Sequence, residues 1–237
     1  MENKNKQIQV VEVEKGTGSF EKVCKENGCK TFTIDWDKKF NPDLVKDVLK
    51  LKKEDIPFIP DIIWLSPPCT EYSHAKRVGE RNLKYADRVS KKNLEIIKWF
   101  PNALFILENP QTGLLKSRSF MVGIPFTDAS YCKYGFTYRK QTRFWNNVGL
   151  KLEVCNKDCK FIKDKKHIGS AGNGRKKYTD KNYKKEEKYQ VPKELCLEIL
   201  KQCLKKLNLK EAPSIPPNPK GQEAQTNASH SEGIGYP

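Results

Sequence analysis

Residues 8–27, IQVVEVEKGTGSFEKVCKEN, contain the pattern that decides the fold. The apolar run 8–13 predicts a buried strand, the glycine turn 16–19 follows it, and residues 20–27 have the spacing of a short helix that ends at Gly28. A strand followed directly by a helix is the unit from which parallel sheets are built. This stretch therefore predicts an α/β fold.

The same alternation of strand and helix continues along the chain. Apolar runs of strand length cover residues 30–35, 61–65 and 103–108. A long amphipathic helix is predicted at 82–100, where Pro101 follows as a stop signal, and residues 42–51 are predicted to form a helical turn leading into an edge strand. Strands that alternate with helices in this way form a parallel sheet with helices on both faces.

The composition and periodicity of the sequence change in the second half of the chain. Short aromatic-rich segments with glycine and cysteine replace the long periodic elements, and then a clear helix returns, with Pro192 suited to its first position. Both ends of the chain lack apolar periodicity. The predicted organisation is a disordered start (1–7), a catalytic, cofactor-binding domain (8–125), a small lobe (126–188), a C-terminal helix (189–210) and a disordered tail (211–237).

Composition favours a polyanionic partner. The 237 residues include 45 Lys and Arg against 29 Asp and Glu, a formal net charge of +16. Such a charge is typical of proteins that bind nucleic acid, although a generally lysine-rich composition is an open alternative. No signal peptide or membrane-spanning run is found, so we expect a cytoplasmic or host-intracellular protein. The eight cysteines are then expected to be reduced and to serve as core residues, nucleophiles or metal ligands.

The first two strands suggest a nucleotide-like ligand. Gly16 and Gly18 let the backbone approach a ligand at the N-terminus of a helix, although an ordinary turn has the same composition. The second strand ends in Asp35, a position where an acidic residue usually binds ribose hydroxyls, and the adjacent Trp36 is suited to stack on an adenine ring. Together these residues predict a nucleoside-containing cofactor at the carboxyl edge of the sheet.

Two further predicted strands end in residues that are candidates for catalysis. Cys69, in SPPCTEYS (66–73), should emerge at the same edge, with its direction fixed by the prolines. It is a candidate nucleophile, and an inert buried cysteine is the alternative. Glu108 ends the next buried strand, where burial would raise its pKa and suit it to carry a proton to a ring nitrogen; a loop cap is the alternative. Gln141 and Arg143 lie on a predicted strand and are suited to hold a base or a phosphate.

In this order, the motifs resemble those of the DNA cytosine-5 methyltransferase family, in a short form of the kind found in viruses and bacteria. GTGSF is similar to the family's cofactor loop, IDWD to its acidic-Trp site, SPPC to its Pro-Cys motif, ENP to its Glu-Asn-Val motif and KQTR to its Gln-x-Arg-x-Arg motif. Asp47 is placed where the family has an acidic residue near the adenine, with Asp55 as a rival. The resemblance covers about residues 8–145 and 189–205.

The resemblance implies a Rossmann-like S-adenosylmethionine-dependent methyltransferase sheet with a small recognition lobe, acting as a monomer on duplex DNA with the target base flipped out. Cys69 would attack C6 of cytosine while Glu108 protonates N3, with Gln141 and Arg143 in the catalytic site. The implied cofactor residues are Gly16, Thr17, Gly18, Ser19, Phe20, Asp35, Trp36, Asp47 and Pro67. An RNA cytosine methyltransferase and an inert nucleic-acid-binding relative are the alternatives.

The sequence departs from the family pattern at four positions. Ser19 stands where a glycine is usual, Thr70 where glutamine is usual and Pro110 where valine is usual. Trp145 takes the place of the second arginine of the Gln-x-Arg-x-Arg motif. The segment available for target recognition is also short, which suggests loose specificity or a small recognition site.

A second group of residues lies in the small lobe. Cys132, Cys155, Cys159 and His167 have a composition and spacing that suit a tetrahedral structural zinc, with separate buried thiols and a surface histidine as the alternative. In residues 175–189, lysine and arginine alternate with tyrosine, which suits binding to DNA phosphates; a solvated lysine-rich loop is the alternative.

Overall fold

A computed structural model describes most of the chain. The described residues are 6–74, 76, 79–169, 187 and 189–211. Three predictions therefore lie wholly or mainly outside them: the disordered N-terminus, the basic and tyrosine-rich segment 175–189, and the disordered tail.

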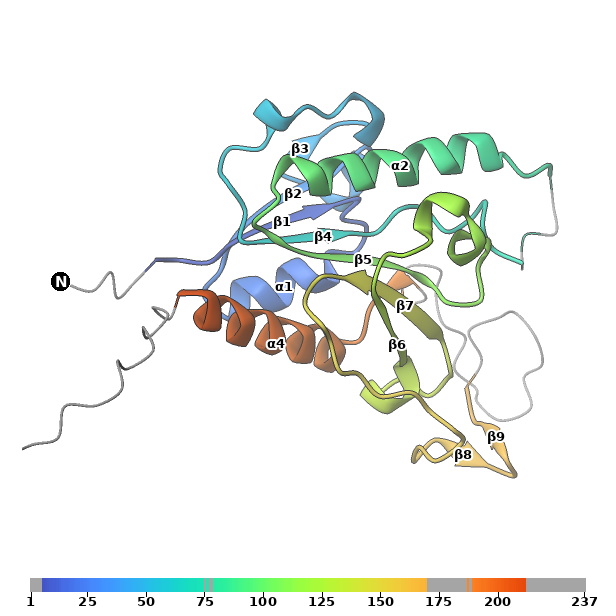
Figure 1. The fold of residues 1–237 in the computed structure, drawn as a ribbon. Helices are drawn as coiled ribbons and strands as arrows, with labels where there is room; N and C mark the ends of the chain where they lie inside the picture. The colour runs from blue at the N-terminus through green and yellow to red at the C-terminus, as the bar shows by residue number, and fades with distance from the viewer. Residues whose placement is uncertain (1–5, 75, 77–78, 170–186, 188, 212–237) are drawn as a thin grey trace, which may run out of the picture.

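Seven strands form one sheet in the order β3-β2-β1-β4-β5-β7-β6 (Figure 1). The strands are β1 (Gln9–Val13), β2 (Lys30–Asp35), β3 (Leu44–Val45), β4 (Ile62–Leu65), β5 (Leu104–Pro110), β6 (Phe126–Ser130) and β7 (Gln141–Asn146). The first five are parallel to one another, whereas β7 runs antiparallel to both β5 and β6. This mixed sheet confirms the predicted Rossmann-like methyltransferase fold.

Helices cover both faces of the sheet, as predicted. Helix α2 (Leu83–Trp99) lies on one face, and α1 (Ser19–Glu26) and α4 (Lys193–Glu211) lie together on the other (Figure 1). The central strands alternate between the two cores: Val10 packs in the cluster shared with α1 and α4, and Val11 in the cluster shared with α2. Burial on both faces explains why these strands are continuous apolar runs.

The C-terminal helix returns to the start of the fold. At the entry to α4, the Val191 N–H donates to Ser19 Oγ at 3.1 Å, and Lys193 forms an ion pair with Glu26 at 2.7 Å. The first turn of α4 is thereby tied to α1, next to the glycine turn. Among the described residues, no helix has both the length and the apolar character that a membrane crossing requires.

The structure differs from the expectations in two places. In residues 42–51 the order is reversed, since the edge strand β3 comes first and a 3₁₀ turn (Val48–Lys50) follows, capped by the Asp47 side chain, which accepts from Leu49 N at 2.9 Å. In addition, β6 and β7 complete the main sheet, because β7 pairs with β5 and buries Phe144 and Trp145. Of the strands described in the predicted lobe, only those of the hairpin β8 (Ile162–Lys163) and β9 (Lys166–His167) lie outside that sheet.

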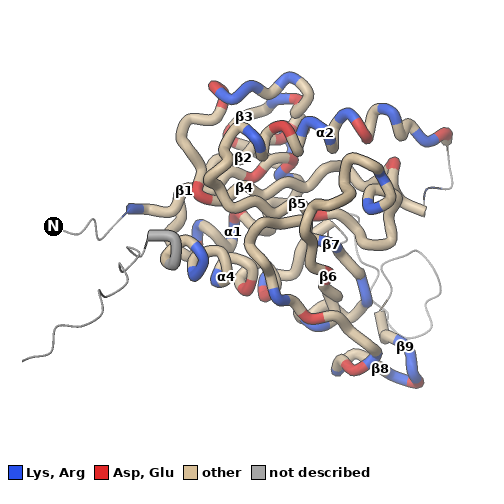
Figure 2. Tube along the Cα trace, viewed as in Figure 1, with Lys and Arg blue, Asp and Glu red and all other residues tan. Residues whose placement is uncertain are grey.

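Positive charge is distributed widely over the described surface. Figure 2 shows lysine and arginine along α2, on α4 and around the β8–β9 hairpin, with acidic residues between them. The described basic residues therefore do not gather on a single element. The net charge therefore does not identify which surface of the protein would contact nucleic acid.

Candidate active site

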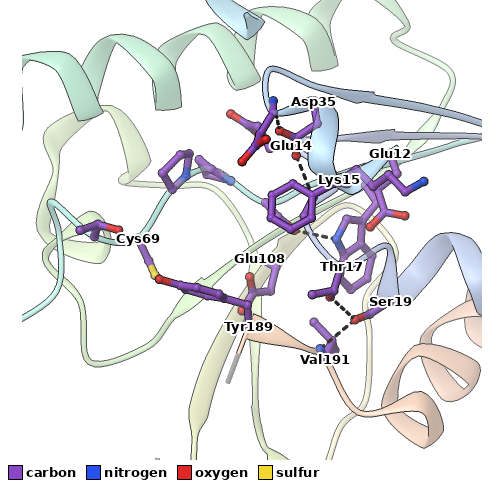
Figure 3. A pocket seen from close by; sticks show the side chains of 18 of the residues that line it. Glu12, Glu14, Lys15, Thr17, Ser19, Asp35, Cys69, Glu108, Tyr189 and Val191 are labelled. Atoms are coloured by element: carbon purple, nitrogen blue, oxygen red, sulfur yellow. Dashed lines mark hydrogen bonds between the residues drawn. The ribbon is translucent and has the colours of Figure 1, made fainter. Parts of the chain in front are cut away.

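A pocket of about 310 Å³ opens at the carboxyl edge of the parallel strands. The loops after β1, β2, β4 and β5 line it, because parallel strands bring their carboxyl ends to one edge. Figure 3 shows Cys69, Glu108, Thr17, Ser19 and Asp35 around this space. The predicted site residues that line it are Gly16, Thr17, Ser19, Asp35, Trp36, Pro67, Cys69 and Glu108.

The glycine turn and the end of β2 are joined by one carboxylate. Asp35 accepts from the Gly16 N–H at 2.8 Å through Oδ2 and from the Asp37 N–H at 2.9 Å through Oδ1 (Figure 3). Each oxygen has a second lone pair that can accept from a ligand hydroxyl. Gly18 is the N-cap of α1 and has a φ of +63°, a left-handed conformation that favours glycine.

Trp36 and Asp47 lie on the side of the pocket next to the end of β2. The Trp36 side chain is 69% exposed at the rim, and an exposed indole beside a pocket is available to stack on a planar ligand. Asp47 lines a small adjoining cavity together with Asp35 and Trp36. Its rival, Asp55, instead forms an ion pair with Lys46 at 2.6 Å and is not among the described lining residues of either cavity. The geometry thus favours Asp47.

Cys69 lies half-buried in the loop after β4. Burial raises the pKa of its thiol and the Glu108 carboxylate adds to that rise, whereas the Lys140 ammonium lowers it. The loop is anchored by Tyr72, which is buried: its N–H donates to the Cys69 carbonyl at 3.1 Å and its hydroxyl donates to Asp87 of α2 at 2.9 Å. The position of the thiol is therefore tied to the α2 face of the fold.

Glu108, near the end of β5, lies where a proton donor is expected. Burial raises the pKa of its carboxyl, and Lys140 and a hydrogen bond from Tyr131 counteract this rise. The Tyr131 hydroxyl donates to Glu108 Oε1 at 3.3 Å. Next to Glu108, the Asn109 side-chain amide donates to the Pro67 carbonyl at 2.8 Å and joins the ENP segment to the SPPC segment.

Besides Gly18 and Asp47, three predicted site residues do not line the described pocket. Arg143 is held by Asp128 through two hydrogen bonds of 2.8 and 2.9 Å and lies over the Phe126 ring. Gln141 starts β7 and is absent from the described lining. Phe20 is buried behind the pocket, stacked on Trp64 with ring centroids 4.4 Å apart.

Several pocket residues were not predicted from the sequence. Lys140, directly before Gln141, lines the pocket and acts electrostatically on both Cys69 and Glu108. Its place in the KQTR motif was the one available signal. Tyr131 carried no recognisable pattern, yet it contacts Glu108. Tyr189 ends the segment 175–189, which was predicted to bind DNA phosphates, and it lines the pocket.

Two glutamates, the buried Glu12 of β1 and the half-buried Glu14 of the turn after it, also line the pocket. Burial raises the pKa of both Glu12 and Glu14 to about 8. Glu12 accepts from the Glu21 N–H at 2.7 Å, and Glu14 accepts from the Asn93 amide at 3.0 Å. The second oxygen of Glu14 is buried without a hydrogen-bond partner among the described residues, which is a costly arrangement for a polar atom. This oxygen suits a ligand that brings a hydrogen-bond partner.

The four predicted metal ligands come together away from this pocket. The ligand atoms of Cys132, Cys155, Cys159 and His167 all lie within 4.8 Å of one another. All eight cysteines are free thiols in the structure.

The fold and the pocket define a Rossmann-like methyltransferase. No family model matches the chain. It is 28% identical over 225 residues to a "Probable DNA (cytosine-5)-methyltransferase" of Frog virus 3 (isolate Goorha), a match that covers 83% of this chain and 100% of the viral protein. This similarity confirms the predicted resemblance to the DNA cytosine-5 methyltransferase family and the prediction that the chain is a methyltransferase.

Among solved structures, the chain is similar to the Entamoeba histolytica methyltransferase EhMeth, with a TM-score of 0.48 and 15% identity. It is also similar to a Spodoptera frugiperda DNMT2 mutant, with a TM-score of 0.43 and 13% identity. Each match covers 63% of this chain, and they span 57% and 54% of the respective solved chains.

Proposed function

We propose that this protein transfers a methyl group from S-adenosylmethionine to C5 of cytosine in DNA, through a covalent bond between Cys69 and the base. The observation that carries the proposal is that Cys69 and Glu108 share one pocket with the glycine turn and Asp35. The similarity to the viral protein supports the same activity. A nucleophile, a proton donor and a nucleotide-like site in one pocket are what this reaction requires.

The residues on one side of the pocket fit S-adenosylmethionine, which supplies an electrophilic methyl group when bound. Each Asp35 oxygen has a second lone pair that could accept from a ribose hydroxyl, and Trp36 offers an exposed ring for the adenine. Asp47 and the unpartnered oxygen of Glu14 are further polar groups at the adjoining cavity. The orphaned oxygen and the exposed indole are both features that a bound nucleoside would satisfy.

The residues on the other side of the pocket fit the target base. The Cys69 sulfur, after loss of its proton, bonds to C6 of cytosine, and the electrons of the C5–C6 double bond move toward the ring nitrogen N3. Glu108 gives its proton to N3, which its raised pKa suits it to do. C5 becomes nucleophilic and takes the methyl group. Water then accepts the C5 proton, N3 returns its proton to the Glu108 carboxylate, and the Cys69 thiolate departs, which restores the C5–C6 double bond.

Two features of this pocket favour the reactive forms of Cys69 and Glu108 in these steps. Lys140 lowers the pKa of the Cys69 thiol and so favours the thiolate that attacks. The hydrogen bond from Tyr131 fixes one oxygen of Glu108 and leaves the carboxyl oriented. Because a cytosine within a duplex cannot reach an enclosed pocket, the base must be flipped out of the stack.

The test is methyl transfer from radiolabelled S-adenosylmethionine to duplex DNA, with transfer RNA in a parallel reaction. We expect label in the DNA, with Cys69→Ser lowering the rate at least 1,000-fold and Cys203→Ala, a buried thiol of α4, retaining most of it. Label in transfer RNA alone would replace DNA by RNA as the substrate. No label in either nucleic acid, from a protein that binds the cofactor, would overturn the proposed activity.

A further inference from the structure

We propose that Cys132, Cys155, Cys159 and His167 bind one Zn²⁺ ion and that this ion holds the turn that positions Glu108. The first part stands on the cluster itself. The second part rests on the proposed function, because it assigns Glu108 a role in proton transfer.

The cluster has the dimensions of a tetrahedral site. Its four ligand atoms lie within 4.8 Å of one another, and Cys155 Sγ lies 3.5 Å from His167 Nε2. Zinc–sulfur bonds of about 2.3 Å and zinc–nitrogen bonds of about 2.0 Å place tetrahedral ligand atoms roughly 3.5–3.8 Å apart. Small side-chain movements therefore complete the coordination. Three sulfurs and one imidazole nitrogen favour zinc over calcium or magnesium, which prefer oxygen ligands.

The four ligands come from three segments of the chain. Cys132 lies in a 3₁₀ turn (Tyr131–Tyr134) after β6, Cys155 and Cys159 lie in the segment between β7 and β8, and His167 lies in β9. The β8–β9 hairpin has two residues in each strand, and such a short hairpin is not stable alone. A shared metal explains how this hairpin keeps its place beside the main sheet.

The loop that carries Cys155 is anchored to the main sheet. The Cys155 N–H donates to Ser130 Oγ at 3.0 Å, which fixes the loop to the end of β6. Two residues further on, Lys157 has a positive φ of 67°, so the chain turns between Cys155 and Cys159. The turn keeps both cysteines in the cluster.

The metal ligand and the partner of Glu108 are consecutive residues. Tyr131, whose hydroxyl donates to Glu108, directly precedes Cys132 in the same 3₁₀ turn. The Tyr131 N–H also donates to the Lys140 carbonyl at 3.1 Å, so the turn is joined to the second group that acts on Glu108. Zinc at Cys132 would thus restrict the turn that orients the proton donor. It acts as a positioning device and takes no part in the reaction.

Metal content of the full-length protein tests the first part. By inductively coupled plasma mass spectrometry, we expect one zinc ion per chain in the wild-type protein and none in Cys159→Ser. Cobalt(II) exchanged into the site should give the visible absorption of a tetrahedral thiolate complex. Zinc should also be present in Cys69→Ser, which makes the result independent of methyl transfer. Less than 0.2 zinc per chain after loading, or a disulfide among Cys132, Cys155 and Cys159 in freshly purified protein, would overturn the site.

The second part is tested by comparing two variants of one ligand. His167→Cys keeps four ligands and is expected to retain zinc and methyl transfer within about threefold, whereas His167→Ala loses zinc. Loss of zinc should lower the rate of methyl transfer at least tenfold and change the Kd for S-adenosylmethionine less than twofold, since the cofactor residues lie on other strands. Zinc-free protein with the wild-type rate would refute the link to Glu108 and leave the proposed activity standing.

Discussion

The side-chain amide of Asn109 donates a 2.8 Å hydrogen bond to the carbonyl of Pro67 and joins two loops that are 42 residues apart in sequence. One loop carries Cys69 and the other follows Glu108. Asn109 is buried, and its own side-chain carbonyl has no hydrogen-bond partner among the described residues. This hydrogen bond, together with the pairing of β4 and β5, therefore helps to set the distance between Cys69 and Glu108, the proposed nucleophile and proton donor.

Replacing Asn109 by alanine should lower methyl transfer about 10- to 100-fold, because a small misplacement of reacting groups costs this much. Binding of S-adenosylmethionine should change less than threefold, as measured by calorimetry. Asn27→Ala is a matched control: Asn27 also donates to a backbone carbonyl at 2.8 Å, at the end of α1 and away from the pocket lining. Equal losses in both variants would show a general effect on stability and contradict the role of Asn109.

Tyr131→Phe should move the pH profile of methyl transfer. The hydrogen bond from Tyr131 lowers the pKa of Glu108, so its removal raises that pKa further. The carboxyl then stays protonated to higher pH, and the alkaline limb of the rate should shift upward. Tyr134→Phe, which removes a hydroxyl that accepts from the Glu153 N–H in the same turn, should leave the limb in place. A shift toward lower pH would contradict the assigned proton donor.

Trp36→Ala should weaken the binding of S-adenosylmethionine about tenfold, since stacking of a base on an aromatic ring contributes roughly 1–3 kcal/mol. Its side chain is 69% exposed, so the melting temperature should hardly change. Ile59→Ala serves as the control, because Ile59 is 78% exposed and is not among the described pocket residues. An unchanged Kd in Trp36→Ala would exclude stacking.

Stability should fall as pH rises from about 5 to about 8, because burial raises the pKa of Glu12 from its ordinary value of 4.5 to about 8. Below pH 4.5 the group is protonated in both the folded and the unfolded state. Above it the unfolded chain ionises first, so unfolding becomes easier until the folded group also ionises near pH 8. At pH 8, the free energy of unfolding of Glu12→Gln, measured by urea unfolding, should therefore be roughly 1–3 kcal/mol higher relative to its value at pH 5 than in the wild-type protein. Glu54→Gln, at an exposed position, should leave the pH dependence unchanged.

Much of the fold and part of the site follow from local sequence. The buried strands are continuous apolar runs, and the glycine turn, Asp35, Cys69 and Glu108 each stand at a strand end, so their meeting at one edge follows from parallel pairing. The pairing of β7 with β5 was not foreseen, because antiparallel partners are set by contacts across the sheet and not by the pattern of one strand.

The missed residues have a common physical cause. Lys140 and Tyr131 act on Glu108 through space, and nothing in their local sequence marks that contact. Glu12 lies in β1 and Glu14 directly follows it. Their charges contradicted the apolar pattern, and only the fold shows that desolvation raises the pKa of both carboxyls. Arg143 matched a motif, yet Asp128 engages its guanidinium in the structure.

The covalent role of Cys69 is tested most directly with duplex DNA that carries 5-fluorocytosine. Fluorine at C5 cannot leave as a proton, so after methyl transfer the bond between sulfur and C6 has no route to break. With S-adenosylmethionine, we expect a complex that survives denaturing electrophoresis in the wild-type protein and in Cys203→Ala, with a mass shift on the peptide containing Cys69. Cys69→Ser should form no such complex. A complex that forms without Cys69, or a wild-type protein that methylates cytosine yet is never trapped, would contradict covalent catalysis by this residue.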